Sequence, residues 1–251
     1  MGLLLKLKPK QRSNWKIFFK HALEMYQADQ FIGTPFGKGG YGYVGNPFSR
    51  VIIEHLHKYS GFAEEFRPIV LVKSLEVLES LIPLTPVQRD VAQKWSPGNL
   101  IFAFSADEID ISFNSSFQAL FSQLLSLSFS NYLYVQVPPH PITQDLFTFL
   151  EDQDLPPILI GFLAEDGPGV PVVDAESFLN EFADRNLGVI LSGGRLQKGS
   201  RPLPSTIITG ATPEIQIIQE GLIAQSQLEE IYSPQTNEND EDNEGDKFDG
   251  F

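Results

Sequence analysis

The spacing of hydrophobic positions alternates between a helical and an extended pattern along most of the chain. Apolar residues at 17, 18, 22, 25 and 26 recur as on one face of a helix, and the run at 31–35 is typical of a strand. The same alternation predicts helices at 48–59, 85–95, 117–125, from 143, and 174–186, and strands at 68–72, 99–104, 132–137, 157–163 and 188–191. Strands that alternate with helices indicate an α/β protein whose sheet contains parallel pairs.

Residues 158–163 (Ile-Leu-Ile-Gly-Phe-Leu) form a short apolar run with prolines on one side and Asp-Gly-Pro-Gly at 166–169 on the other. This composition is typical of a strand that is buried on both faces of a sheet. In open α/β sheets, ligands bind beside the loop that leaves the carboxyl end of a central strand. The loop after residue 163 is therefore the default location for a ligand site.

The composition favours a globular protein of the cytoplasm. A chain of 251 residues can bury one sizeable core. No apolar run reaches the ~18 residues that a membrane span requires, and the apolar start, Met-Gly-Leu-Leu-Leu, is too short for a secretion signal. The absence of cysteine excludes disulfides and thiolate metal sites, and a reducing cytoplasm is the location that we expect.

The net charge of −14 is distributed unevenly along the chain. Segment 236–251 carries seven acids and one lysine, and the first twenty residues carry six basic residues and no acid. We predict a basic extension at 1–14 and one domain at 15–232. Because the end of the chain has few apolar residues, we predict that 233–251 form a disordered acidic tail. An acidic body repels phosphate backbones, and this disfavours general nucleic-acid binding.

The acidic tail also contains two aromatic residues, Phe248 and Phe251. A solubilising tail is one interpretation. The other is a docking motif, in which a phenylalanine fills a pocket on another protein while the acids meet a basic rim. Within the chain, the segment from Lys6 to Lys20 is the one partner of opposite charge for the tail.

The glycine-rich stretch at 33–42 is not a phosphate-binding loop of the Walker type. Three residues, rather than four, separate Gly33 from Gly37-Lys38, and a glycine follows the lysine where a Ser or Thr is required. We therefore expect a flexible loop after a strand. His55 and His57 lie two residues apart on a helix and face different sides, so we expect no metal site.

Several segments resemble the YrdC-like family in order and spacing. They are Val-Pro-Pro-His-Pro at 137–141, Pro-Leu-Thr-Pro at 83–86 with Lys-Trp-Ser-Pro-Gly at 94–98, Pro-Ser-Thr-Ile-Ile at 204–208, and residues 217–223. The resemblance covers roughly residues 15–223. It implies a single α/β domain with a twisted, open, mixed sheet flanked by helices. Active members of the family are threonylcarbamoyl-adenylate synthases, which use ATP with Mg, threonine and bicarbonate.

The resemblance also places this chain's residues at the positions of the family's site. Those that fit a ligand-binding role are Lys38, Tyr41, Lys58, Ser205 and Thr206. The positions that depart from the family pattern are Ser60, Gln136 and Gln219, where the family has arginine, and Phe162 and Ala164, where it has Ser-x-Asn. We expect the aromatic ring at 162 to be buried and to make the cleft smaller and less polar.

The missing arginines imply a loss of catalysis. A glutamine offers a neutral amide where a guanidinium would form a stronger, charge-assisted pair with a phosphate or carboxylate. The resemblance therefore suggests a non-canonical scaffold that binds a nucleotide or double-stranded RNA without being an enzyme, and that has no certain cofactor. The alternative is an active synthase of tRNA threonylcarbamoyladenosine modification, with ATP and Mg.

Overall fold

The computed structural model describes residues 3–60, 66–106, 109, 115–127, 131–182, 186–198, 202–209 and 216–232. The strands are β1 (Leu3–Lys6), β2 (Phe31–Pro35), β3 (Tyr41–Gly45), β4 (Ile69–Val72), β5 (Leu100–Ser105), β6 (Tyr132–Gln136), β7 (Ile158–Leu163), β8 (Leu187–Ser192), β9 (Thr206–Thr209) and β10 (Ile217–Gln219). The helices are α1 (Trp15–Gln27), α2 (Arg50–Ser60), α3 (Leu75–Leu81), α4 (Pro86–Trp95), α5 (Ser115–Leu127), α6 (Pro141–Glu151), α7 (Ala175–Phe182) and α8 (Gln225–Tyr232), with a 3-10 turn, η1, at Pro9–Asn14.

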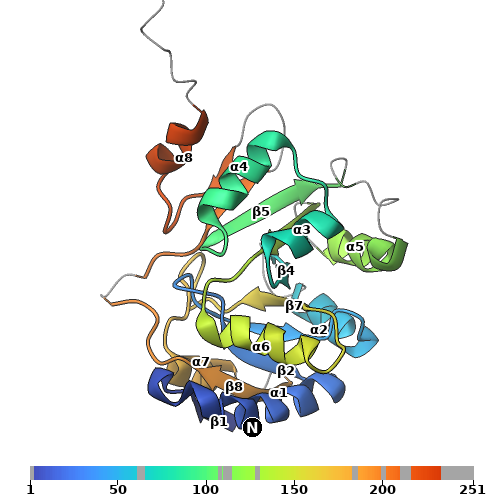
Figure 1. The fold of residues 1–251 in the computed structure, drawn as a ribbon, viewed down its shortest axis with the longest axis vertical. Coiled ribbons are helices and arrows are strands. Elements are labelled where there is room, and N and C mark those ends of the chain that lie inside the picture. Colours follow the sequence, from blue (N-terminus) through green and yellow to red (C-terminus); the bar gives the residue numbers. More distant parts are fainter. Residues whose placement is uncertain are drawn as a thin grey trace, which may run out of the picture.

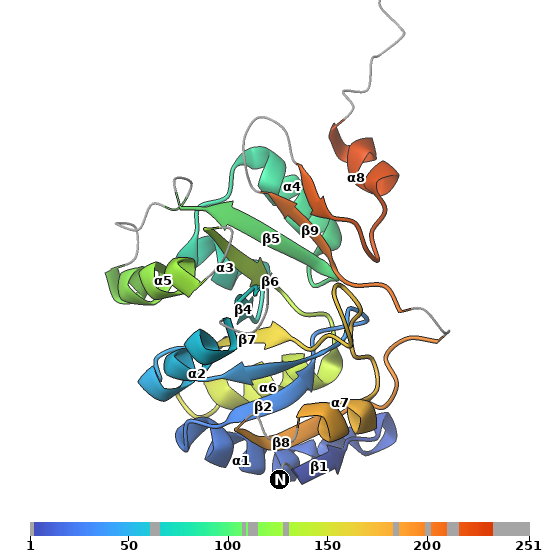
Figure 2. The same ribbon diagram turned by 180° about the vertical axis from the view of Figure 1, so that it is seen from behind.

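All ten strands belong to one sheet, in the order β1-β8-β2-β3-β7-β4-β6-β5-β9-β10. The pairs β1–β8, β8–β2, β4–β6 and β5–β9 are parallel, and the remaining pairs are antiparallel. The single α/β domain with a large twisted mixed sheet is therefore confirmed. Helices α1 and α6 cover one side of the sheet around β2 and β8, and α2 and α7 cover the other (Figures 1 and 2).

The ends of the predicted domain differ in what the structure describes. Residues 3–6, part of the predicted basic extension, form strand β1 and pair in parallel with β8. The predicted acidic tail lies outside the described residues, so the domain boundaries stay predictions. Within the described part of the chain, no helix is both long and apolar enough to cross a membrane.

The centre of the sheet is built on the pairing of β3 with β7. Tyr43 and Phe162 are direct partners in this pair, and their rings stack with 4.7 Å between the centroids. The rings of Phe31, Tyr59 and Phe66 also lie within about 6 Å of the Phe162 ring. Only 6% of Phe162 is exposed, which confirms the prediction that this aromatic residue is buried.

Phe162→Ala should lower the free energy of unfolding by about 3–5 kcal/mol, because the truncation leaves a cavity among four other rings. Chemical denaturation of both proteins would measure the difference. Phe48 is the matched control, since half of this residue is exposed (51%), and Phe48→Ala should cost less than about 1 kcal/mol. Equal effects of the two substitutions would contradict the central position of Phe162.

Candidate functional site

The turn between β2 and β3, residues 36–40 (Phe-Gly-Lys-Gly-Gly), lies inside the protein. Every residue of the turn except Lys38 is buried. The Phe36 amide donates a hydrogen bond to the Gly40 carbonyl at 2.9 Å. Gly37 and Gly40 have φ values of 130° and 125°, which only glycine adopts readily. The glycine-rich stretch therefore forms a tight, buried turn in place of the flexible loop that its composition suggested.

Two residues that precede strands β5 and β9, Asn99 and Ser205, pack directly against this turn. Asn99, which precedes β5, accepts a hydrogen bond from the Gly39 amide at 3.2 Å through its Oδ1 atom. A Cβ atom added to Gly37 would lie 2.5 Å from the same oxygen. A Cβ atom added to Gly39 would lie 3.1 Å from the backbone nitrogen of Ser205 and 3.2 Å from its Cβ. The turn can approach these residues so closely because it has no side chains at these points.

Gln136, the last residue of β6, holds the turn from another side. Its Nε2 atom donates to the Phe36 carbonyl at 3.3 Å and to the Gly98 carbonyl at 3.0 Å. Its Oε1 atom and the Ser205 Oγ atom are both buried without a hydrogen-bond partner among the described residues. A buried polar atom without a partner costs about 1–3 kcal/mol. These two atoms are the hydrogen-bonding groups that the folded protein leaves unused at the turn.

Arg67, just before β4, brings a positive charge to the same region. Its Nη1 atom donates to Gln219 Oε1 at 2.6 Å, and Gln219 Nε2 donates in turn to the Ser205 carbonyl at 3.2 Å. Gln219 stands where the family resemblance places an arginine, so the structure brings a guanidinium beside that position from the segment that precedes β4. The sequence analysis missed Arg67, because nothing near it indicates a contact with a residue 152 positions further along the chain.

Tyr41 and Thr206 are already engaged in structural hydrogen bonds. The Tyr41 hydroxyl donates to the Gly194 carbonyl at 2.7 Å and accepts from the Gly193 amide at 3.0 Å. Burial raises the pKa of Tyr41 to about 12, so the phenol stays protonated at neutral pH. The Thr206 hydroxyl donates to the Ile223 carbonyl at 2.8 Å and accepts from its amide at 2.9 Å. Both hydroxyls therefore hold segments of the fold together.

The two predicted lysines are exposed. Lys58 lies near the end of α2, where the Ser60 hydroxyl donates to the His57 carbonyl at 2.8 Å. The side chain of Lys38 points to the surface from the turn, while its carbonyl accepts a hydrogen bond from Gln197 Nε2 at 2.5 Å. The described contacts do not join Lys58 to the turn. Of the predicted site residues, those that the structure brings together at the turn are Lys38, Tyr41, Gln136, Ser205 and Gln219.

The loop after β7, which was the default location for a ligand, has an exposed tip and a buried base. Residues 165–170 are exposed. At the base, the Ala164 amide donates to the Tyr41 carbonyl at 2.9 Å, and the Val172 amide donates to the Ala164 carbonyl at 2.9 Å. A Cβ atom added to Gly40 would lie 2.9 Å from Pro171. The base of this loop thus forms another wall of the turn.

His140 caps the helix that begins beside the turn. Its Nδ1 atom accepts a hydrogen bond from the Ile142 amide at 3.3 Å, at the start of α6. A Cβ atom added to Gly193 would lie 2.7 Å from the imidazole ring, so the ring is packed against the backbone. Burial lowers the pKa of His140 to about 4. The ring is therefore neutral at pH 7, as its role as a hydrogen-bond acceptor requires.

Comparison with known proteins identifies the fold. The sequence matches no family model and no curated protein. Among solved structures, Sua5 of P. abyssi complexed with L-threonine superposes with a TM-score of 0.68 at 16% identity, over 93% of this chain and 61% of that one. YciO of E. coli superposes with a TM-score of 0.66 at 18% identity, over 88% of this chain and 97% of that one. The likeness extends to full-length HypF in a phosphate- and nucleotide-bound form, with a TM-score of 0.55 and 12% identity over 81% of this chain and 29% of that one.

These superpositions show that the chain has a YrdC-like fold, as the sequence resemblance implied. The chain spans about 60% of the length of the P. abyssi protein. It spans nearly all of the E. coli protein. At identities of 18% and below, the likeness establishes the architecture, and the chemistry of this chain has to be argued from its own residues.

Gly39→Ala should lower the free energy of unfolding by about 1–3 kcal/mol, because the added methyl group enters the space of Ser205. Ser205→Ala, which removes the unpaired hydroxyl, should be neutral or slightly stabilising. The cost of Gly39→Ala should be smaller in the Ser205→Ala background, since the clashing oxygen is gone. Denaturation of the two single variants and the double variant measures this coupling, and strictly additive effects would contradict direct packing.

His140→Asn should make stability less sensitive to acid. The pKa of His140 is lower in the folded protein than its usual value of 6.5, so the unfolded chain binds the proton more readily. The contribution of neutral His140 to the free energy of unfolding is fully present above pH 6.5 and is lost as the pH falls towards 4. Asparagine keeps the capping acceptor without titrating. Wild type should lose about 2 kcal/mol more than the variant over this range, with part of the full shift discounted for solvent access. Parallel pH profiles would contradict this.

Proposed function

We propose that this YrdC-like protein is a binding scaffold that does not catalyse adenylate synthesis. The proposal rests on the hydrogen bonds that the polar groups at the buried turn already form within the protein. Asn99 and Gln136 bind the protein's own backbone, and the exposed Lys58 makes no described contact with the turn. Neutral groups that already hold the fold cannot also neutralise a triphosphate.

The charge deficit supports this proposal quantitatively. By the family resemblance, Ser60, Gln136 and Gln219 replace three arginines. Each charge-assisted hydrogen bond to a substrate contributes about 1.5–3 kcal/mol, and each 1.36 kcal/mol of lost transition-state stabilisation reduces the rate tenfold. Even partly additive losses lower the rate by many orders of magnitude.

The proposed ligand is a nucleotide or a similar small polar molecule that binds mainly through neutral hydrogen bonds. Gln136 Oε1 can accept a hydrogen bond, and the Ser205 hydroxyl can donate or accept one. HypF and P. abyssi Sua5, which share the fold, bind a nucleotide and L-threonine, respectively, in their structures, so these are the first compounds to test. The net charge of −14 disfavours double-stranded RNA as the ligand. We also propose a cytoplasmic location, which is the one expected for a chain without cysteine.

One observation favours the alternative of an active synthase in tRNA modification. Arg67 contacts Gln219 and supplies a guanidinium beside the position where the resemblance expects an arginine. In the alternative, ATP with Mg is the anionic substrate, and Arg67 would contact it in place of the missing arginine. The alternative therefore makes Arg67 essential for turnover, whereas the scaffold proposal requires no turnover at all.

The two functions separate in one assay. We expect no pyrophosphate release from ATP with threonine and bicarbonate above the rate without protein. Calorimetric titration with ATP, with and without threonine, measures binding in the same samples. Turnover at ordinary enzyme rates that is lost in Arg67→Gln would establish the alternative. The matched control is Arg89→Gln, because Arg89 pairs with Glu79 on the surface of the protein.

A further inference from the structure

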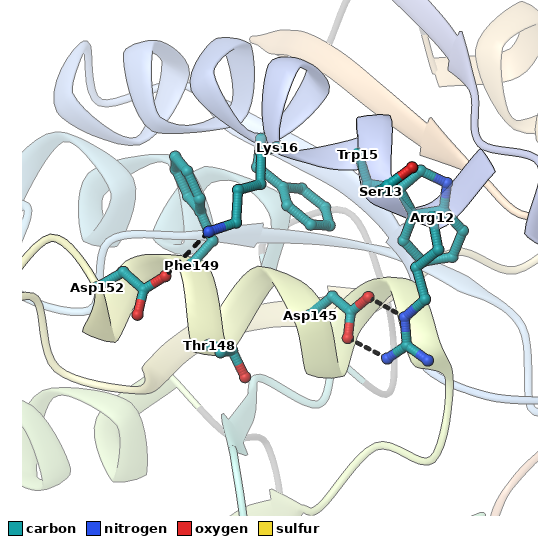
Figure 3. A pocket seen from close by; sticks show the side chains of 9 residues that line it. Arg12, Ser13, Trp15, Lys16, Asp145, Thr148, Phe149 and Asp152 are labelled. Carbon is teal, nitrogen blue, oxygen red and sulfur yellow. Dashed lines mark hydrogen bonds and ion pairs between the residues drawn. The ribbon is translucent and has the colours of Figure 1, made fainter.

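A groove between α1 and α6 lies apart from the buried turn. Its volume is about 220 Å³. The floor is aromatic and consists of Trp15, Phe19 and Phe149, of which 3%, 3% and 8%, respectively, is exposed. The rim is charged, with Arg12 and Lys16 on the side of α1 and with Asp145 and Asp152 on α6 (Figure 3). An aromatic floor with a charged rim fits a ligand that carries both an apolar ring and charges.

The two cations of the rim retain capacity for a further anion. Arg12 contacts the Asp145 carboxylate through Nε and Nη2, and its other N–H groups remain available because a guanidinium has five donors. Lys16 lies 3.8 Å from Asp152, and its side chain is 75% exposed. An ion pair so long and so exposed is weak and exchangeable.

Further lysines near the groove add positive charge that the two ion pairs of the rim do not neutralise. Lys8 and Lys10 precede α1, and Lys20 follows Lys16 by one helical turn. These three exposed lysines have no ion pair within the described part of the chain. The α1 side of the rim therefore lies on a segment, residues 8–20, that carries positive charge in a chain whose net charge is −14.

We propose that this groove binds the acidic aromatic segment 236–251 of a second copy of the chain. The segment carries a net charge of −6, from seven acids and one lysine, and contains Phe248 and Phe251. A phenylalanine ring of the segment packs on the aromatic floor, and its carboxylates approach Arg12 and the lysines around it. The match is therefore one of aromatic surface and of charge.

The span of the chain favours a second copy over the segment's own domain. Helix α8, after which the segment follows, lies at the opposite end of the molecule from α1 in both views (Figures 1 and 2). A chain of 19 residues has a root-mean-square span of about 25 Å, whereas a compact domain of this size measures about 45 Å across. Binding within one copy would hold the segment at nearly twice its root-mean-square span, which has an entropic cost.

Trp15, in the floor of the groove, provides a direct probe. The chain has two tryptophans, so Trp95→Phe leaves Trp15 as the sole emitter. In this background, Trp15 emission and the sedimentation mass should both change with protein concentration at low salt. The double substitution Phe248→Ala and Phe251→Ala should weaken this association at least about tenfold, because it removes the buried rings.

Charge variants test the rim. Lys16→Glu should also weaken the association, and Lys94→Glu, on the distant helix α4, is the matched control that should not. Salt at 1 M should abolish the association, because screening then acts within about 3 Å. A Trp15 response that depends on segment 236–251 but not on protein concentration would show that the segment binds the groove of its own copy. That result would overturn the proposed binding between two copies. Association that the phenylalanine substitutions leave unchanged would overturn the proposal altogether.

Discussion

The close approach of the β2–β3 turn to the rest of the sheet is the constraint on which the fold of this protein depends. Residues 36–40 touch Asn99, Ser205 and Pro171, which belong to three segments far apart in the sequence. Only residues without side chains allow the backbone to come so near. A single short turn thereby packs against three segments at once and links strands that lie far apart in the sequence.

The same packing decides what the site can do. Polar side chains beside this turn are available for a ligand only where they do not already form hydrogen bonds with the protein's own backbone. Here Gln136 donates to two carbonyls and Thr206 makes both of its hydrogen bonds to one residue. Two unpaired atoms, Gln136 Oε1 and Ser205 Oγ, and the Arg67 guanidinium beside Gln219 remain. The proposed scaffold function rests on this small set of groups.

The sequence predicted the long periodic elements well and the glycine-rich ones poorly. Strand β2 and the buried strand β7 follow from apolar runs, and α4 begins at Pro86, where Thr85 forms a capping box. Strand β3 was missed because its two glycines and its proximity to the turn obscure its alternation. For the site, the family resemblance pointed to Ser205 and Gln136, but Arg67 and Asn99 reach it only through the folding of distant segments.

The parallel pairing of β1 with β8 has a consequence for how the chain acquires its structure. Leu3 pairs with Val189, so the first described strand finds its partner only after almost the whole domain has been made. Contacts between residues so far apart in sequence have a high loop-closure cost and slow the folding reaction. During synthesis, the amino-terminal strand must therefore remain unpaired until β8 has been made, and only the opposite edge, formed by β9 and β10, follows later in the chain.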